Sequence, residues 1–214
     1  MEKDKFEYLL SKNRLESYNS IDEHFDNLYL ISNITPKIAV LEIILRNLLD
    51  DNLNKENPSW IFDKDNKIIC DELRRISSID KSDLTHHQYL SRFMLGSIIK
   101  LITTNRLQNK ILNLKDIDYK KYSLTNRNFC FIHGKKHKFS HINNSNIVLN
   151  LLWTIRNRSF HWENLLKIRE ENNILFPRIT TREHGTSIGI DPGKIELFLS
   201  DFIKSINEDL LNYC

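Results

Sequence analysis

The chain has 214 residues, a net charge of +3, and hydrophobic and charged contents of 40% and 28%, which exclude an intrinsically disordered protein. Three widely separated cysteines exclude a disulfide framework, and no apolar run approaches the roughly 18 residues of a membrane span. The charged N-terminus is unlike a signal peptide, so we expect a cytoplasmic protein that does not engage a membrane. Five glycines and four prolines give few turn signals and favour long helices.

The N-terminal part of the chain is predicted to be helical. Residues 3–31 indicate one or two amphipathic helices with a break at Asn19-Ser20. Thr35-Pro36 indicates a new helix start, with threonine as the N-cap and proline as the first helical residue. Asn57-Pro58-Ser59 breaks the chain afterwards. Between these breaks, the apolar residues at helical spacing are Ile38, Leu41, Ile44, Leu45 and Leu48.

The central part continues in the same way. Residues 68–77 indicate a short helix, and Ser82-Asp83 opens a longer helix that runs through Ile102. Within it, Gly96 either allows close packing of a neighbour or is a tolerated flaw. Residues 105–145 are polar, basic and aromatic, and we expect partial helix and a long loop there.

The C-terminal part begins with an apolar run from Asn146 to Ile155, which indicates a buried helix. Residues 174–190 look like a loop, with room for a short extended pair, and Asp191-Pro192 starts the last helix. The predicted fold is therefore all-α, with about six helices in one bundle-like domain and a basic loop insertion. Residues 1–32 would form a helical appendage, residues 33–170 the core, and residues 171–214 a loop with the C-terminal helix.

The positive charge is concentrated in one stretch of the sequence. From Tyr119 to Trp162 there is no aspartate or glutamate, whereas the remainder of the chain has a net negative charge. Such segregation is typical of a surface that binds a polyanion, although a solvated basic loop has the same composition. The eight cations of this stretch are Lys120, Lys121, Arg127, Lys135, Lys136, Lys138, Arg156 and Arg158.

The same stretch contains residue types that bind metals, at Cys130, His133, His137 and His141. Their spacing matches no strong zinc pattern, and a single cysteine contributes, so we expect no metal site. The basic loop more simply contacts phosphates or is solvated. The aromatic residues between the cations either stack on unpaired bases or pack against the helices.

Two arginines, an asparagine and a histidine follow the apolar run, in the string from Arg156 to His161. A histidine transfers protons near neutral pH, and a guanidinium binds phosphate through a planar fork. Asn157 and His161 share a helix face, so Asn157 could orient the histidine, whereas Arg156 and His161 diverge by about 140° on a regular helix. A joint site then needs a distorted last turn, a long reach or a second chain. The alternative is a helix end where these cations meet local carboxylates such as Glu163.

Two segments resemble one protein family. The motif Arg156-Asn157-x-x-x-His161, within the string from Trp153 to Leu165, resembles the Arg-x(4–6)-His helix of HEPN domains, in particular the Abi-like (abortive infection) branch. The segment from Leu41 to Asp50 resembles the upstream Leu-Glu-x-x-Leu-Arg-Asn helix of that branch. The two segments are in family order and together cover about 25 residues.

The resemblance implies a HEPN-type helical bundle and a metal-independent endoribonuclease of toxin or phage-defence type. His161 would be the general acid or base, Arg156 would stabilise charge on the phosphate, and Asn157 would assist them. No cofactor is implied. Partners would be RNA, a second copy that completes a composite cleft, and an antitoxin or regulatory RNA. Residues expected to bind substrate or support the motif are Glu42, Arg46, Asn47, Lys135, Lys136, Lys138 and Arg158.

Two alternatives stay open from the sequence. The first is a non-catalytic RNA-binding or regulatory module with the same fold and basic surface. The second is a helical bundle that only binds other proteins. Cleavage of RNA in EDTA, and binding of RNA with a steep salt dependence, separate the three hypotheses.

Overall fold

The computed structural model describes residues 3–171 and 174–214. Residues 1–2 and 172–173, which the sequence assigns to the N-terminal appendage and the C-terminal segment, lie outside the described residues. The α-helices are α1 (Lys3–Leu10), α2 (Lys12–Leu15), α3 (Ile21–Glu56), α4 (Lys67–Ile79), α5 (His86–Arg92), α6 (Leu95–Thr104), α7 (Gln108–Ile111), α8 (His141–Phe160) and α9 (Ile195–Ile206). Short 3-10 helices are η1 (Trp60–Phe62), η2 (Tyr119–Lys121), η3 (Pro192–Lys194) and η4 (Glu208–Tyr213). The strands are β1 (Phe129–Ile132), β2 (Lys135–Lys138), β3 (Ile168–Glu171), β4 (Ile174–Pro177), β5 (Ile179–Glu183) and β6 (Thr186–Ile190).

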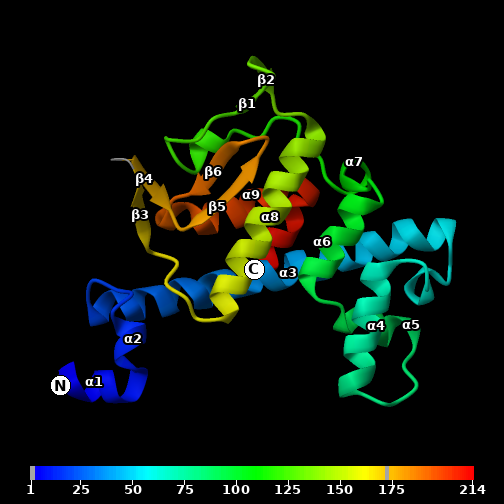
Figure 1. The fold of residues 1–214 in the computed structure, drawn as a ribbon, viewed down its shortest axis with the longest axis horizontal. Helices are drawn as coiled ribbons and strands as arrows, with labels where there is room; N and C mark the ends of the chain where they lie inside the picture. Colours follow the sequence, from blue (N-terminus) through cyan, green and yellow to red (C-terminus); the bar gives the residue numbers. More distant parts are fainter. Residues whose placement is uncertain (1–2, 172–173) are drawn as a thin grey trace.

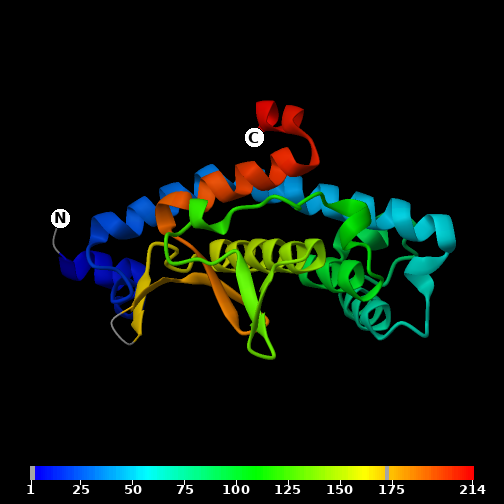
Figure 2. The ribbon, with the colours of Figure 1, turned by 90° about the horizontal axis from the view of Figure 1, so that it is seen from above.

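Helix α3 is the longest element and spans the molecule along its long axis (Figure 1). Helix α9 lies alongside α3, and α8 packs against α3 in the next layer (Figure 2). Strand β5 packs against α8, and β6 pairs with β5. The main core lies where α3, α6, α8 and α9 meet. Its fully buried residues on α3 repeat at helical spacing and are Ile34, Ile38, Leu41, Leu45 and Leu49.

The predicted break at Asn19-Ser20 is confirmed, because Ser20 caps α3 by accepting a hydrogen bond from the Glu23 N–H. The predicted helix start at Thr35-Pro36 is wrong, since α3 continues through both residues. Proline leaves the Ser32 carbonyl without its helical donor. Ser32 and Pro36 are both exposed, so water can satisfy that carbonyl, and the helix is not interrupted.

Two other helix predictions have different outcomes. The helix expected at residues 68–77 is confirmed as α4, whereas the long helix expected from Ser82 is divided into α5 and α6 by extended backbone at Phe93 and Met94. Close packing at Gly96 is confirmed. A Cβ atom there would lie 3.0 Å from the Trp153 Nε1 atom, so the glycine lets α6 approach α8.

The prediction of an all-α fold is wrong, because the described residues include three two-stranded antiparallel sheets, β1–β2, β3–β4 and β5–β6. Two of the hairpins turn through the same dipeptide, His133-Gly134 and His184-Gly185, and all four residues have positive φ. Two successive residues of positive φ make the tight turn whose twist matches that of the paired strands. Glycine adopts this backbone freely and histidine does so more readily than most residues, so few glycines were enough for two hairpins.

Helix α3 is also the one helix of the described residues that is long and apolar enough to cross a membrane. Length and composition alone are weak evidence for a span, because the core helix of a soluble protein meets the same criteria. Here the apolar face of α3 is buried against α6, α8 and α9. We therefore interpret α3 as a core helix.

Gly189 on β6 packs directly on Pro177, which leads to a stability prediction. A Cβ atom at Gly189 would lie 2.5 Å from Pro177 Cγ, and the proline ring cannot rotate away. We expect Gly189→Ala to lower the free energy of unfolding by about 1–3 kcal/mol, as overpacked substitutions do. Urea denaturation measures it, with Gly193→Ala as the control because no atom lies within 4 Å of a Cβ there. Equal stability of the two variants would contradict this packing.

Candidate functional site

Helix α8 carries the Arg/His motif to its C-terminal end. Ser140 caps the helix at its start, and its apolar face is buried from Ile147 to Ile155. The helix closes in a Schellman motif, in which the Trp162 N–H donates to the Ser159 carbonyl and the Glu163 N–H to the Arg158 carbonyl. Trp162 stands at the left-handed position with φ of 55°, where glycine is usual. The chain therefore turns sharply directly after His161, and the histidine lies exposed at the turn.

Arg156 points from α8 towards α3. Its Nε atom lies 3.6 Å from Glu42 Oε2, and its Nη1 atom donates to Asn157 Oδ1 at 3.3 Å. The guanidinium also lies 5.0 Å from the centre of the Phe160 ring. The Arg156 side chain is 28% exposed, and its Nε atom has no hydrogen-bond partner among the described residues. Arg156 is thus held in place from three sides and keeps donor capacity for an anion.

His161 lines a different space, a cavity of about 240 Å³ at the end of α8. The other lining residues come from the α2 region, the turn after α8, and the link between β4 and β5. They are Arg14, Ser17, Trp162, Glu163, Asn164 and Arg178. No hydrogen bond or ion pair joins Arg156 to His161 within the described residues. The regular helix up to Phe160 keeps the two side chains apart, as their spacing of five residues predicts.

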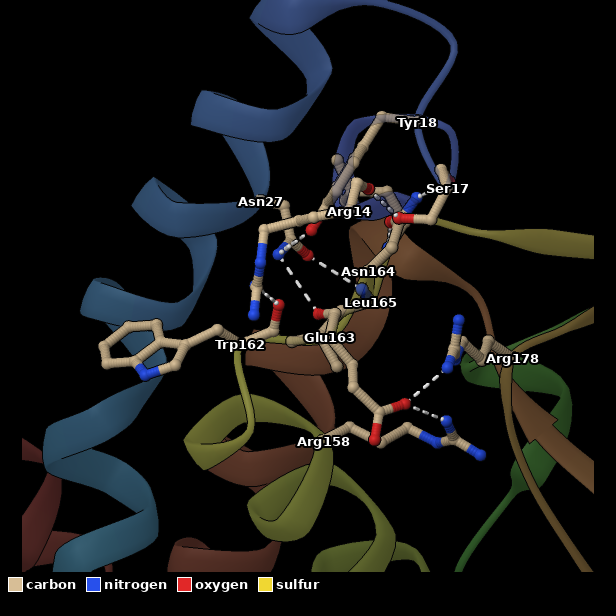
Figure 3. A network of polar contacts seen from close by, with 11 residues as sticks. Arg14, Ser17, Tyr18, Asn27, Arg158, Trp162, Glu163, Asn164, Leu165 and Arg178 are labelled. Atoms are coloured by element: carbon tan, nitrogen blue, oxygen red, sulfur yellow. Dashed lines mark hydrogen bonds and ion pairs between the residues drawn. The ribbon is translucent and has the colours of Figure 1, made fainter. Parts of the chain in front are cut away.

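A polar network fixes the wall of this cavity (Figure 3). Glu163 accepts from Arg158 at 2.6 Å and also pairs with Arg178. Arg14 donates to the Trp162 carbonyl at 2.8 Å, and the Asn164 side chain donates to the Ser17 carbonyl at 2.6 Å. Arg158 therefore meets the local carboxylate Glu163, as the alternative reading of the motif expected, and part of its charge is neutralised there.

Arg14 and Arg178 are the cations that sequence reasoning missed at this site. They stand far from the motif in the sequence and lie outside the acid-free stretch. Their only sequence signal is their charge, which many surface arginines share. The antiparallel pairing of β3 with β4 returns the chain and brings Arg178 back to the end of α8.

The other residues expected at the site are distributed over three places. Glu42 contacts Arg156, and Arg46 follows one turn later on α3, with a buried Nε atom that lacks a partner among the described residues. Asn47 faces a separate shallow cavity with Asp50 and His87. The basic residues of β2 stand at the opposite end of α8 from His161, and the 20-residue helix between them is about 30 Å long. These basic residues of β2 are Lys135, Lys136 and Lys138.

The cysteine and histidines of the basic stretch are separated by the hairpin. Cys130 is buried on β1, His133 is in the turn, and His137 is exposed on β2. His141 Nε2 accepts a hydrogen bond from the Leu114 N–H at 3.0 Å. The part of the chain that the structure describes has no group of three or more His, Cys, Asp or Glu residues that could hold a metal ion.

His24 packs behind the cavity and gives the protein an acid-sensitive contact. It is 2% exposed and lies edge-on to Tyr18, with ring centres 4.8 Å apart. Burial lowers the pKa of His24 below its ordinary value of 6.5, and the nearby Arg14 charge lowers it further. The unfolded chain then binds the proton more readily, so stability is full above pH 6.5 and is lost as the pH falls through the lowered pKa.

We expect His24→Phe, which keeps a ring at this position, to reduce that loss. The measurement is the urea midpoint of both proteins at pH 7.5 and pH 5. The wild type should lose more stability between the two values than the variant. An equal loss in both proteins would mean that His24 does not cause the acid sensitivity.

Comparisons with protein-family models, with curated proteins and with solved structures gave no match to this chain. The resemblance to HEPN domains therefore rests on the two quoted segments alone.

Proposed function

We propose that this protein is a metal-independent endoribonuclease of the HEPN type, with Arg156 and His161 as its catalytic residues. The observation that carries the proposal is the ion pair between Glu42 and Arg156. It joins the two segments that resemble the family, although they are far apart in the sequence. A toxin or phage-defence role, with an antitoxin or regulatory RNA as partner, stays a prediction of the resemblance.

The proposed reaction uses the RNA 2′-hydroxyl as an internal nucleophile. His161 removes its proton, the 2′-oxygen bonds to phosphorus, and the bond from phosphorus to the 5′-oxygen breaks. The leaving 5′-oxygen takes up the proton that His161 removed from the 2′-hydroxyl, so the imidazole ends the step neutral. Arg156 stabilises the charge that develops on the phosphoryl oxygens, and Glu42 and Asn157 hold its guanidinium. The products are a 2′,3′-cyclic phosphate and a 5′-hydroxyl, and DNA is not cut because it lacks the nucleophile.

The geometry within one chain supports a site shared by two copies. Arg156 is held towards α3, whereas His161 faces the cavity with Arg14 and Arg178. In a homodimer in which the α8 ends meet, the arginine of one copy can approach the histidine of the other. In the alternative arrangement, one chain forms the whole catalytic site, and Arg14 and Arg178 replace Arg156 as the cations that bind the phosphate.

Mixing two inactive variants distinguishes these arrangements. Arg156→Ala and His161→Ala proteins are unfolded and refolded together, so that mixed dimers form, and RNA cleavage is measured in EDTA. A shared site regains activity, because one cleft of the mixed dimer contains an intact arginine from one copy and an intact histidine from the other. If the wild type cleaves but the mixture does not, the shared site is wrong. If the wild type binds RNA and never cleaves it, the non-catalytic module is the correct function.

A further inference from the structure

The two hairpins with His-Gly turns enclose a cavity that the proposed cleavage site does not use. The hairpins β1–β2 and β5–β6 are joined by a hydrogen bond from Thr186 Oγ1 to the Phe129 carbonyl at 3.4 Å. The cavity between them has a volume of about 550 Å³, which is within the range of roughly 300–1,000 Å³ typical of ligand sites. Its main side-chain walls are Arg127, Phe131, Phe176 and His184.

Positive charge that the protein does not neutralise lies on and beside this cavity, because Arg127 lines it and Lys136 pairs with Phe131 across the β1–β2 hairpin. All four residues of β2 are exposed, and among the described residues Arg127, Lys135, Lys136 and Lys138 make no ion pair. A carboxylate nearby is Glu183, which already accepts from Asn143 at 2.8 Å and lies 3.7 Å from His184. An anion beside Phe131 would therefore meet cations that have no carboxylate partner among the described residues.

Aromatic rings accompany these cations. Phe131 is 51% exposed beside the cavity, and the Phe129 ring meets it edge-on with centres 5.7 Å apart. Lys136 Nζ lies 4.1 Å from the centre of the Phe129 ring, so a lysine and a ring face are already adjacent. Unpaired cations with accessible rings are the combination by which proteins hold single-stranded nucleic acid.

We propose that this cavity binds an unpaired base of single-stranded RNA, stacked on Phe131, with the flanking phosphates on Arg127 and the lysines of β2. The choice of RNA rests on the proposed function, which it deepens by naming single strands as the substrate class. A base in a duplex is stacked on its neighbours and cannot enter the cavity. The cavity shares no lining residue with the cavity at His161, so binding and cleavage can be tested with separate substitutions.

The test is fluorescence anisotropy with a labelled 12-nucleotide single-stranded RNA and the full-length His161→Ala protein, which is expected to bind without cutting. In this background we expect Phe131→Ala to weaken binding about tenfold, because stacking on an aromatic ring contributes that much for a single base. Phe131→Trp keeps the stacking surface and should retain the affinity. The matched control is Tyr29→Ala, which removes an exposed ring from α3 away from the cavity.

The charged part of the proposal has its own readout. Lys136→Gln should weaken binding and lower the slope of log affinity against log salt by about 0.7, the value for one phosphate contact on a single strand. A duplex RNA of the same length should bind more weakly than the single strand. Equal binding by Phe131→Ala and its parent, or equal affinity for the duplex, would overturn this inference. If the wild-type protein binds RNA through Phe131 but does not cut it, the proposed function is wrong and this inference stands.

Discussion

His161→Ala is expected to lower the rate of RNA cleavage by about 10²–10⁴-fold, the usual contribution of a general acid or base. Arg156→Ala should lower it by about 10²–10³-fold, because charge on the phosphoryl oxygens is then not stabilised. Both effects should appear in the rate constant at saturating RNA more than in RNA affinity. The measurement is single-turnover cleavage of a labelled single-stranded RNA in EDTA.

The controls for this prediction separate chemistry from folding. His87→Ala removes an exposed histidine on α5, away from the motif, and should leave the cleavage rate unchanged. Arg156→Lys keeps the positive charge but loses the planar fork, so it should recover only part of the rate. A decrease of less than tenfold for either alanine variant, with folding intact, would remove that residue from the catalytic site.

The largest effect on stability is expected for Asn27→Ala. Asn27 is fully buried on α3, and its side chain donates to the Tyr18 hydroxyl and to the Glu163 carbonyl, both at 3.1 Å. Its Oδ1 atom accepts from the Leu165 N–H at 2.7 Å. The alanine variant leaves these groups without partners, each at a cost of about 1–3 kcal/mol when buried. We expect the free energy of unfolding to decrease by about 3 kcal/mol, measured by urea denaturation.

Asn33→Ala is the matched control for this substitution, because Asn33 lies exposed on the same helix. Its stability should change by no more than about 0.5 kcal/mol, as is usual for surface positions. Asn27 also holds the segment that follows the motif. Asn27→Ala should therefore reduce RNA cleavage even at urea concentrations at which the variant is still folded. Equal stability of the two variants would mean that Asn27 does not anchor this segment.

The helices could largely be predicted from the sequence, because their apolar residues repeat with the helical period. In the predicted stripe, Ile38, Leu41 and Leu45 are fully buried, whereas Ile44 and Leu48 are half-buried. The run up to Ile155 is also buried on its apolar face, although Trp153 is exposed. The start at Thr35-Pro36 was wrongly predicted, since a proline signal has the same form at a helix start and on the exposed side of a continuing helix. The β1–β2 hairpin was missed because β2 has no buried face and shows no alternation of apolar and polar residues. The extended pair allowed for within residues 174–190 corresponds to β5 and β6.

The candidate site could be predicted only in part. The resemblance paired Glu42 with the motif helix, and the structure places Glu42 beside Arg156. The lysines of β2 were expected near His161 because both lie in the same basic stretch of the sequence. In the structure, the 20-residue helix α8 separates them. Arg14 and Arg178 reach His161 through tertiary contacts between distant segments, and no local pattern encodes such contacts.

The most direct test of the proposed ribonuclease is the mass of the RNA ends produced by the wild-type protein in EDTA. We expect fragments that end in a 2′,3′-cyclic phosphate and begin with a 5′-hydroxyl, and we expect none from Arg156→Ala or His161→Ala protein. Fragments with a 3′-hydroxyl and a 5′-phosphate, or cleavage that requires added Mg²⁺, would contradict catalysis by an Arg/His site that uses the 2′-hydroxyl.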